Sequence, residues 1–161
     1  MEEAEITAFG GLGGFDEGLV SWIKYAIVRD DPTDDPFLRE LVDRVDPEII
    51  VSGIGEQPAI IHLKAFGLGG FTSGCVCVNP ALSQSMLRSL AERDSARAEE
   101  IREIFKPLED LRNAINPIRV LHEAVKEAGI AETGPHLPLL SPVTEHERNH
   151  IRAASQKLMH V

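Results

Sequence analysis

The sequence predicts an α/β fold in which parallel strand–helix–strand units are followed by an all-helical region. Strand-like runs at 19–28, 48–53 and 70–78 alternate with helical segments at 34–45 and 57–67, and the links between them are short. This alternation is typical of parallel βαβ units. Only 5% of the residues are aromatic, whereas 43% are hydrophobic, so the predicted core is aliphatic.

Each predicted helix of the first half has recognisable ends. The segment 34–45 starts with an aspartate and an early proline, as helices often do. Its apolar residues fall on one helical stripe: Phe37, Leu38, Leu41, Val42 and Val45. The segment 57–67 is expected to stop at Gly67.

The second half of the chain is predicted to contain four helices. They cover residues 80–94, 95–113, 116–129 and 144–159, and an extended connector precedes the last. Pro107 lies inside the second of them and predicts a kink. Asn116, Pro117 and Gly129 mark the ends of the third.

Length and charge restrict the classes of protein. A chain of 161 residues suffices for one domain with a real core. The net charge of -10 argues against nucleic acid or an anionic membrane surface as a partner, but allows a small anionic substrate in a locally positive pocket. No apolar run reaches the roughly 18 residues of a membrane span. The acidic opening MEEAEI is unlike a secretory signal, so we expect a cytoplasmic protein.

Neither cysteine nor histidine patterns predict a metal site, and no cofactor is predicted. Cys75 and Cys77 are expected on one strand, as two reduced core thiols. The letters HExxH at 146–150 match a zinc motif. Thr144 and Glu147, however, have the spacing of a helix capping box, which gives Glu147 a structural role.

Lys24 is the most informative residue, because it interrupts the apolar run WIKYAIV. One interpretation is an edge-strand lysine whose ammonium reaches water. The other is an inward-pointing lysine that burial keeps neutral, so that its amine condenses with a ketone. Strand alternation puts Trp22, Lys24 and Ala26 on one face and Tyr25 on the other. Spacing alone leaves both interpretations open.

Several segments in order resemble the C-terminal half of the dihydrodipicolinate synthase / N-acetylneuraminate lyase family of class I aldolases and dehydratases. The resemblance covers about 140 residues, counted from Leu19 to the end. The segments that carry it are IKYA (23–26), SGIGE (52–56), GGFTSGCVCVNP (69–80), NPIRVLHEAVKEAGI (116–130) and LPLLSPVTE (137–145).

The resemblance implies the C-terminal part of a (β/α)8 barrel, strands six to eight, followed by a three-helix extension. It implies that Lys24 forms a Schiff base with pyruvate or a related 2-oxo acid. Gly53 would end the seventh strand at the face where barrel active sites lie, and Thr72 would contact the keto acid, with Ser73 beside it. The helices starting near 95, 117 and 144 would form the extension.

The departure from the family is the missing first half. A (β/α)8 barrel typically needs roughly 250 residues, so strands one to five have no counterpart here. We divide the chain into an atypical segment (1–15), a partial barrel (16–94) and a helical extension (95–161).

Two functions follow from this departure. The first is a truncated Schiff-base lyase with little or no activity alone. The second is a non-catalytic fragment that acts as a folded or partner-binding domain. Open barrel edges favour a homo-oligomer or association with another chain in either case.

Overall fold

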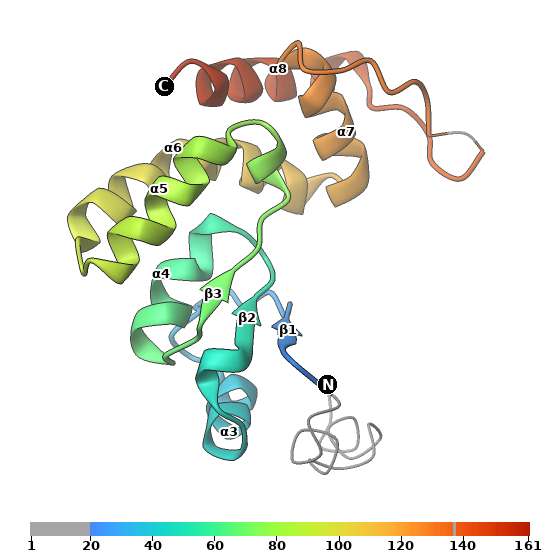
Figure 1. The fold of residues 1–161 in the computed structure, drawn as a ribbon. Helices are drawn as coiled ribbons and strands as arrows, with labels where there is room; N and C mark the ends of the chain where they lie inside the picture. The colour runs from blue at the N-terminus through green and yellow to red at the C-terminus, as the bar shows by residue number, and fades with distance from the viewer. Residues whose placement is uncertain (1–19, 137) are drawn as a thin grey trace.

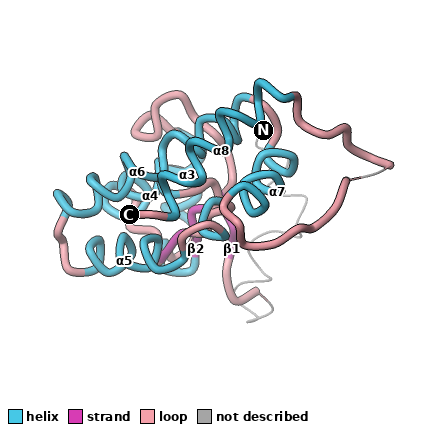
Figure 2. The backbone as a smooth tube through the Cα atoms, turned by 90° about the horizontal axis from the view of Figure 1, so that it is seen from above, coloured by secondary structure: helices cyan, strands magenta, loops and turns pink. Residues whose placement is uncertain are grey.

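The computed structural model describes residues 20–136 and 138–161 and has an α/β architecture dominated by helices (Figure 1). Residues 1–15, predicted as an atypical segment, lie outside the described residues. The small sheet and the helices beside it occupy one end of the molecule, and the later helices occupy the other. In Figure 2 the strands lie beneath the helices that cover one face of the sheet.

The sheet is parallel throughout, as the alternation of elements predicts. It contains three strands in the order β1-β2-β3, which are Ile23–Tyr25, Ile50–Ser52 and Gly70–Phe71. Lys24 is paired with Val51, and Val51 with Gly70. Two hydrogen bonds continue the ladder beyond the strand ends: the Gly53 N–H donates to the Tyr25 carbonyl, and the Thr72 N–H donates to the Ser52 carbonyl.

The prediction of a strand over 70–78 is wrong in its second half. The strand ends at Phe71, and Cys75–Cys77 form a 3-10 turn, η2, instead. A Cβ at Gly74 would lie 2.4 Å from Leu121 Cδ1 of a later helix, so the chain turns where that helix packs against it. Consequently the two cysteines differ: Cys75 is buried and Cys77 is exposed. Burial raises the pKa of the Cys75 thiol, which favours its neutral form.

Helices α3 and α4 cover one face of the sheet. Helix α3, Pro36–Arg44, is capped by Asp35, and α4, Glu56–Ala65, ends just before Gly67, whose φ of +75° suits glycine. This face forms a hydrophobic cluster with the helices: Tyr25, Leu38, Leu41, Val45, Ile50, Phe66 and Leu68. The opposite face, which carries Lys24, has no such covering layer among the described elements.

The remaining helices form the larger part of the core. They are α5 Pro80–Ala91, α6 Ser95–Ala114, α7 Pro117–Glu127 and α8 Glu145–Met159. Their starts agree with the sequence prediction because each has a polar N-cap, and Pro107 lies inside α6. The second cluster joins these helices to α4, and Met86, Ile101, Phe105, Leu108 and Leu158 are among its fully buried side chains.

No helix within the described residues is long and apolar enough to cross a membrane.

Candidate active site around Lys24

Lys24 lies in the middle of β1, at the edge of the sheet, and its side chain is exposed. Tyr25 beside it is only 3% exposed, so the two side chains are on opposite faces, as strand alternation predicts. The burial expected for an inward-pointing lysine is therefore not present. In the described residues the lysine lies on an open sheet face.

Gly53 leaves room for the Lys24 side chain. A Cβ at Gly53 would lie 2.7 Å from both Cγ and Cε of Lys24, and 2.9 Å from the Tyr25 carbonyl oxygen. Real Cβ atoms do not approach other atoms so closely, so only glycine allows the lysine to extend across the end of β2. The structure thus brings Gly53 and Lys24 together.

Thr72 lies on the same open face, immediately after β3. Its backbone is held on both sides: the N–H donates to Ser52 at 2.7 Å, and the carbonyl accepts the Gly55 N–H at 3.1 Å. The Thr72 side chain is exposed. A ligand on this face would therefore meet the Thr72 hydroxyl or the second lone pair of its carbonyl oxygen.

Ser73 differs from Thr72, because its hydroxyl is buried. The Oγ has no hydrogen-bond partner among the described residues. Within the sequence-predicted set, the open face therefore holds Lys24, Gly53 and Thr72.

Tyr25 belongs to a buried network behind the strand. Its hydroxyl donates to Asp35, which also receives the Arg29 side chain at 3.1 Å and the Leu38 N–H at 2.9 Å. Burial opposes ionisation of Asp35, but these hydrogen bonds outweigh it and hold the pKa of Asp35 below its usual value. Burial and the Asp35 carboxylate raise the pKa of Tyr25. Tyr25 also lies on the opposite face of the strand from Lys24.

A pocket of about 240 Å³ lies beyond the carboxyl ends of β1 and β2. Val28 and Ile54, which follow these strands, line it together with Arg112 of α6. Three arginines and two aspartates contribute to its wall: Arg29, Arg102, Arg112, Asp30 and Asp110. In barrel enzymes the active site lies at this end of the strands.

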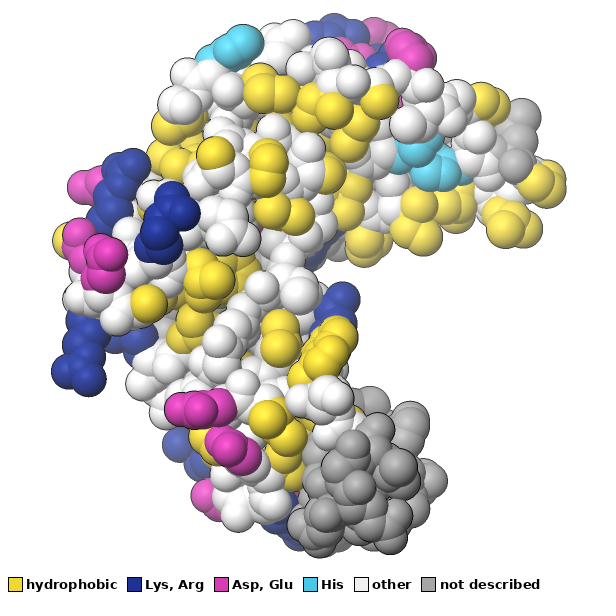
Figure 3. Space-filling view, in the orientation of Figure 1, with side chains coloured by type: hydrophobic (Ala, Val, Ile, Leu, Met, Phe, Trp, Pro, Cys, Tyr) yellow, Lys and Arg dark blue, Asp and Glu magenta, His cyan; other side chains and the backbone are white. Residues whose placement is uncertain are grey.

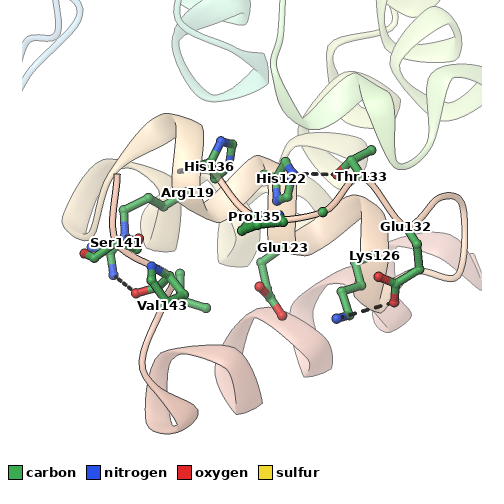
Figure 4. A pocket seen from close by; sticks show the side chains of 12 residues that line it. Arg119, His122, Glu123, Lys126, Glu132, Thr133, Pro135, His136, Ser141 and Val143 are labelled. Carbon is green, nitrogen blue, oxygen red and sulfur yellow. Dashed lines mark hydrogen bonds and ion pairs between the residues drawn. The ribbon is translucent and has the colours of Figure 1, made fainter. Parts of the chain in front are cut away.

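A second pocket, of about 340 Å³, lies away from the strands, between α7 and the connector to α8 (Figure 4). The rings of His122 and His136 meet there with centroids 3.7 Å apart, and the Thr133 hydroxyl lies 2.6 Å from His122 Nε2. Lys126 and Glu132 form an ion pair of 3.3 Å at its other end. His122 and His136 are isolated from each other in the sequence, and no local signal indicates that the connector folds back onto α7.

The HExxH letters belong to a capped helix. Thr144 and Glu147 form the complete capping box, with the Glu147 N–H donating to Thr144 Oγ1 at 3.2 Å. The described part of the chain contains no group of three or more His, Cys, Asp or Glu side chains that could hold a metal ion.

Neither protein-family models nor curated proteins match the chain, but solved structures do. Dihydrodipicolinate synthase from Oceanobacillus iheyensis matches with 26% identity and a TM-score of 0.70, over 85% of this chain and 45% of that one. The enzyme from Bacillus clausii matches with 24% identity and a TM-score of 0.72, over 85% and 46% of the two chains. The enzyme from Agrobacterium tumefaciens matches with 21% identity and a TM-score of 0.70, over 86% and 46%.

The chain thus spans slightly less than half the length of the solved structures that it matches. Its parallel sheet then corresponds to part of the fold of these enzymes, which implies a fragment of a (β/α)8 barrel. The described residues have the structure of a C-terminal half of the dihydrodipicolinate synthase family, which confirms the resemblance that the sequence motifs predict.

Proposed function

We propose that the chain carries the nucleophilic half of a Schiff-base-forming lyase, an aldolase or dehydratase that acts on pyruvate or a related 2-oxo acid. The observation that supports this most directly is the position of Lys24, an accessible amine laid across the Gly53 backbone on the open face of a parallel sheet. The likeness to dihydrodipicolinate synthases supports the same reaction class.

The chemistry requires only one amine and a ketone. The Lys24 nitrogen attacks C2 of the 2-oxo acid, water leaves, and an iminium ion remains. This iminium withdraws electrons from the neighbouring carbon, which allows a carbon–carbon bond to form or break, or a β-substituent to leave. In the proposed site Gly53 and Thr72 bind the keto acid beside Lys24, and Ser73 follows Thr72 in the chain.

We assign β1, β2 and β3 to strands six, seven and eight of the family barrel, and α6, α7 and α8 to its three-helix extension. Parallel pairing in sequence order and the share of the chain that matches support this assignment. Strands one to five would supply the remaining walls of the pocket. Without them we expect weak catalysis, because the second substrate has no complete binding site.

The second candidate function is a non-catalytic fragment that binds another chain through the open barrel face. Trp22 and Val28, which flank Lys24, are 56% and 63% exposed, which favours a covering partner. The outer edges of β1 and β3 are unpaired in the described sheet, and a homo-oligomer or a complementary barrel half would cover them. Size-exclusion chromatography with light scattering measures the association.

Trapping with borohydride separates the two functions. The protein is incubated with pyruvate and sodium borohydride, and its intact mass is measured from pH 7 to pH 9. The proposed lyase gains the mass of pyruvic acid minus one oxygen atom, and Lys24→Ala loses this adduct. Lys64→Ala, which removes an exposed lysine from α4, retains it. No adduct at any pH in this range favours the non-catalytic fragment.

A further inference from the structure

The turn that joins β2 to α4, residues 53–57, is held by two side chains of α6. Both carboxylate oxygens of Glu109 accept backbone N–H groups at the start of α4, from Glu56 and from Gln57, each at 2.9 Å. Arg112 Nη2 donates to the carbonyl oxygen of Ile54 at 2.6 Å. We call this pair, Glu109 and Arg112, the α6 clamp.

The turn is shaped to admit the Glu109 carboxylate. Gly55 has a φ of +110°, and a Cβ there would lie 1.6 Å from Glu109 Oε1. The Gly55 N–H donates to the Thr72 carbonyl, so the same turn also contacts the end of β3. Gly53, at the start of the turn, lies against Lys24. The clamp therefore acts one short segment away from the lysine.

Glu109 of the clamp forms a buried pair of carboxyl groups with Glu56 of α4. Glu56 and Glu109 are both 0% exposed, and Arg112 is 7% exposed. Glu56 Oε1 accepts the Ser83 hydroxyl at 2.7 Å, whereas its Oε2 is buried without a partner. Burial and the neighbouring Glu56 raise the pKa of Glu109 to about 8, against the opposing effect of Arg112. The pair therefore holds a proton at neutral pH.

We propose that Glu109 and Arg112 are positioning residues of the Lys24 site, which hold the β2–α4 turn and Gly53 in place as long as the Glu56–Glu109 pair retains its proton. The link to catalysis rests on the proposed Schiff-base function of Lys24. Neither residue touches the reacting atoms; both act through the turn.

The charges around the Glu56–Glu109 pair determine whether loss of its proton tightens or loosens the turn. Glu56 of α4 raises the pKa of Glu109, and Arg112 of α6 lowers it. The charges of all three residues also affect the pKa of the Cys75 thiol in η2. Helix α5 contributes only the neutral Ser83 hydroxyl. When the proton leaves, two carboxylates face one guanidinium in a buried site, and they repel each other. The turn then loosens, and Gly53 is no longer held against β1.

Hydrogen exchange measures how firmly the clamp holds the turn, and it needs no substrate. We follow the amides of Gly53, Glu56 and Gln57 by NMR between pH 6 and pH 8, after correction for intrinsic exchange rates. We expect their protection to fall about tenfold or more over this range, because opening releases the pair's proton. The wild-type titration needs no variant, and protection independent of pH overturns the proton dependence.

Two variants that each replace one carboxyl group of α6 by a carboxamide show which group matters. Glu109→Gln has an uncharged side chain with one acceptor oxygen, so we expect lower protection at pH 6 and no pH dependence. Glu100→Gln removes an exposed carboxylate of the same helix, and should retain the wild-type profile. Equal profiles for Glu109→Gln and the wild type overturn the role of Glu109.

Trapping with pyruvate connects the clamp to the site. We expect Glu109→Gln to form the borohydride-dependent adduct about tenfold more slowly at pH 6.5. Arg112→Lys should be partly impaired, because it retains the positive charge but not the planar fork of donors. A Glu109→Gln protein that traps pyruvate like the wild type overturns the positioning role. A wild-type protein that forms no adduct overturns the proposed function instead, and hydrogen exchange then decides on the clamp alone.

Discussion

Gly53 and Lys24 are fitted to each other across two neighbouring strands. A Cβ at Gly53 would lie 2.7 Å from two carbons of the Lys24 side chain. The Lys24 side chain therefore occupies space that a side chain at position 53 would need. Because β1 and β2 are parallel, this contact lies toward the carboxyl ends of the strands, where barrel enzymes place their chemistry.

Gly53→Ala should displace Lys24 and slow the trapping of pyruvate about tenfold or more, because small displacements of reacting groups are costly. Gly70→Ala in β3 is the matched control, since a Cβ there meets nothing within 4 Å. The rate of adduct formation is measured by intact mass. Equal rates for both variants would show that Gly53 does not position the lysine.

Gly55→Ala should destabilise the fold by about 3 kcal/mol, because it combines a positive φ with a clash against Glu109. Gly129→Ala has a similar backbone strain, with φ +72°, but open space around it. We expect a loss of only about 1–2 kcal/mol there. Urea denaturation compares the two variants, and equal losses would contradict the close approach of the Glu109 carboxylate.

The protein should lose stability as the pH rises from 5 to 8. The pKa of Glu109 is about 8 in the fold, above its ordinary value of 4.5. Its contribution is therefore fully present below 4.5 and is lost as the pH rises through 8, an effect on the order of 2 kcal/mol. Urea denaturation at several pH values measures the slope. In Glu109→Gln this slope should be much smaller, and an unchanged slope would assign the effect to other groups.

Tyr25→Phe should cost about 1–3 kcal/mol, because it removes a hydroxyl donor from the buried Asp35 carboxylate. It should leave the yield of trapped pyruvate unchanged, since the phenol lies on the opposite face from Lys24. Thermal denaturation and intact mass provide the two readouts. A loss of trapping in a folded Tyr25→Phe protein would mean that the phenol participates in the chemistry.

The helices were predictable from sequence because their signals are local. Four of the helices are capped by a polar residue that the sequence shows: Asp35, Asn79, Asn116 and Thr144. Each of these helices starts within two residues of the predicted position. The strands were predicted too long, because pairing depends on distant neighbours. Gly74 is an example, because its surroundings include Leu121 of α7, which is remote in the sequence.

A Schiff-base role for Lys24 is predicted only by the order of several motifs, since spacing alone leaves two interpretations open. Its exposure was not predictable, because it depends on which strands cover the face. The Glu56–Glu109 pair was not predictable either. It exists because α6 packs on α4 and brings together residues that are remote in the sequence.

The molecular surface beside β1 is open and partly apolar. In the space-filling view the molecule curves around a hollow, and β1 borders it (Figures 1 and 3). Exposed apolar side chains flank this strand, namely Val20, Trp22 and Val28. A covering chain should protect the Trp22 indole, so tryptophan fluorescence should shift to shorter wavelength when the protein associates.

A Schiff-base site at Lys24 is tested best by locating the trapped pyruvate with tandem mass spectrometry after proteolysis. The chain offers five lysines as alternatives: Lys24, Lys64, Lys106, Lys126 and Lys157. We predict that the adduct lies on the peptide that contains Lys24 and that Lys24→Arg abolishes it. An adduct distributed over the exposed lysines, or none between pH 7 and pH 9, would contradict a Schiff-base site at Lys24.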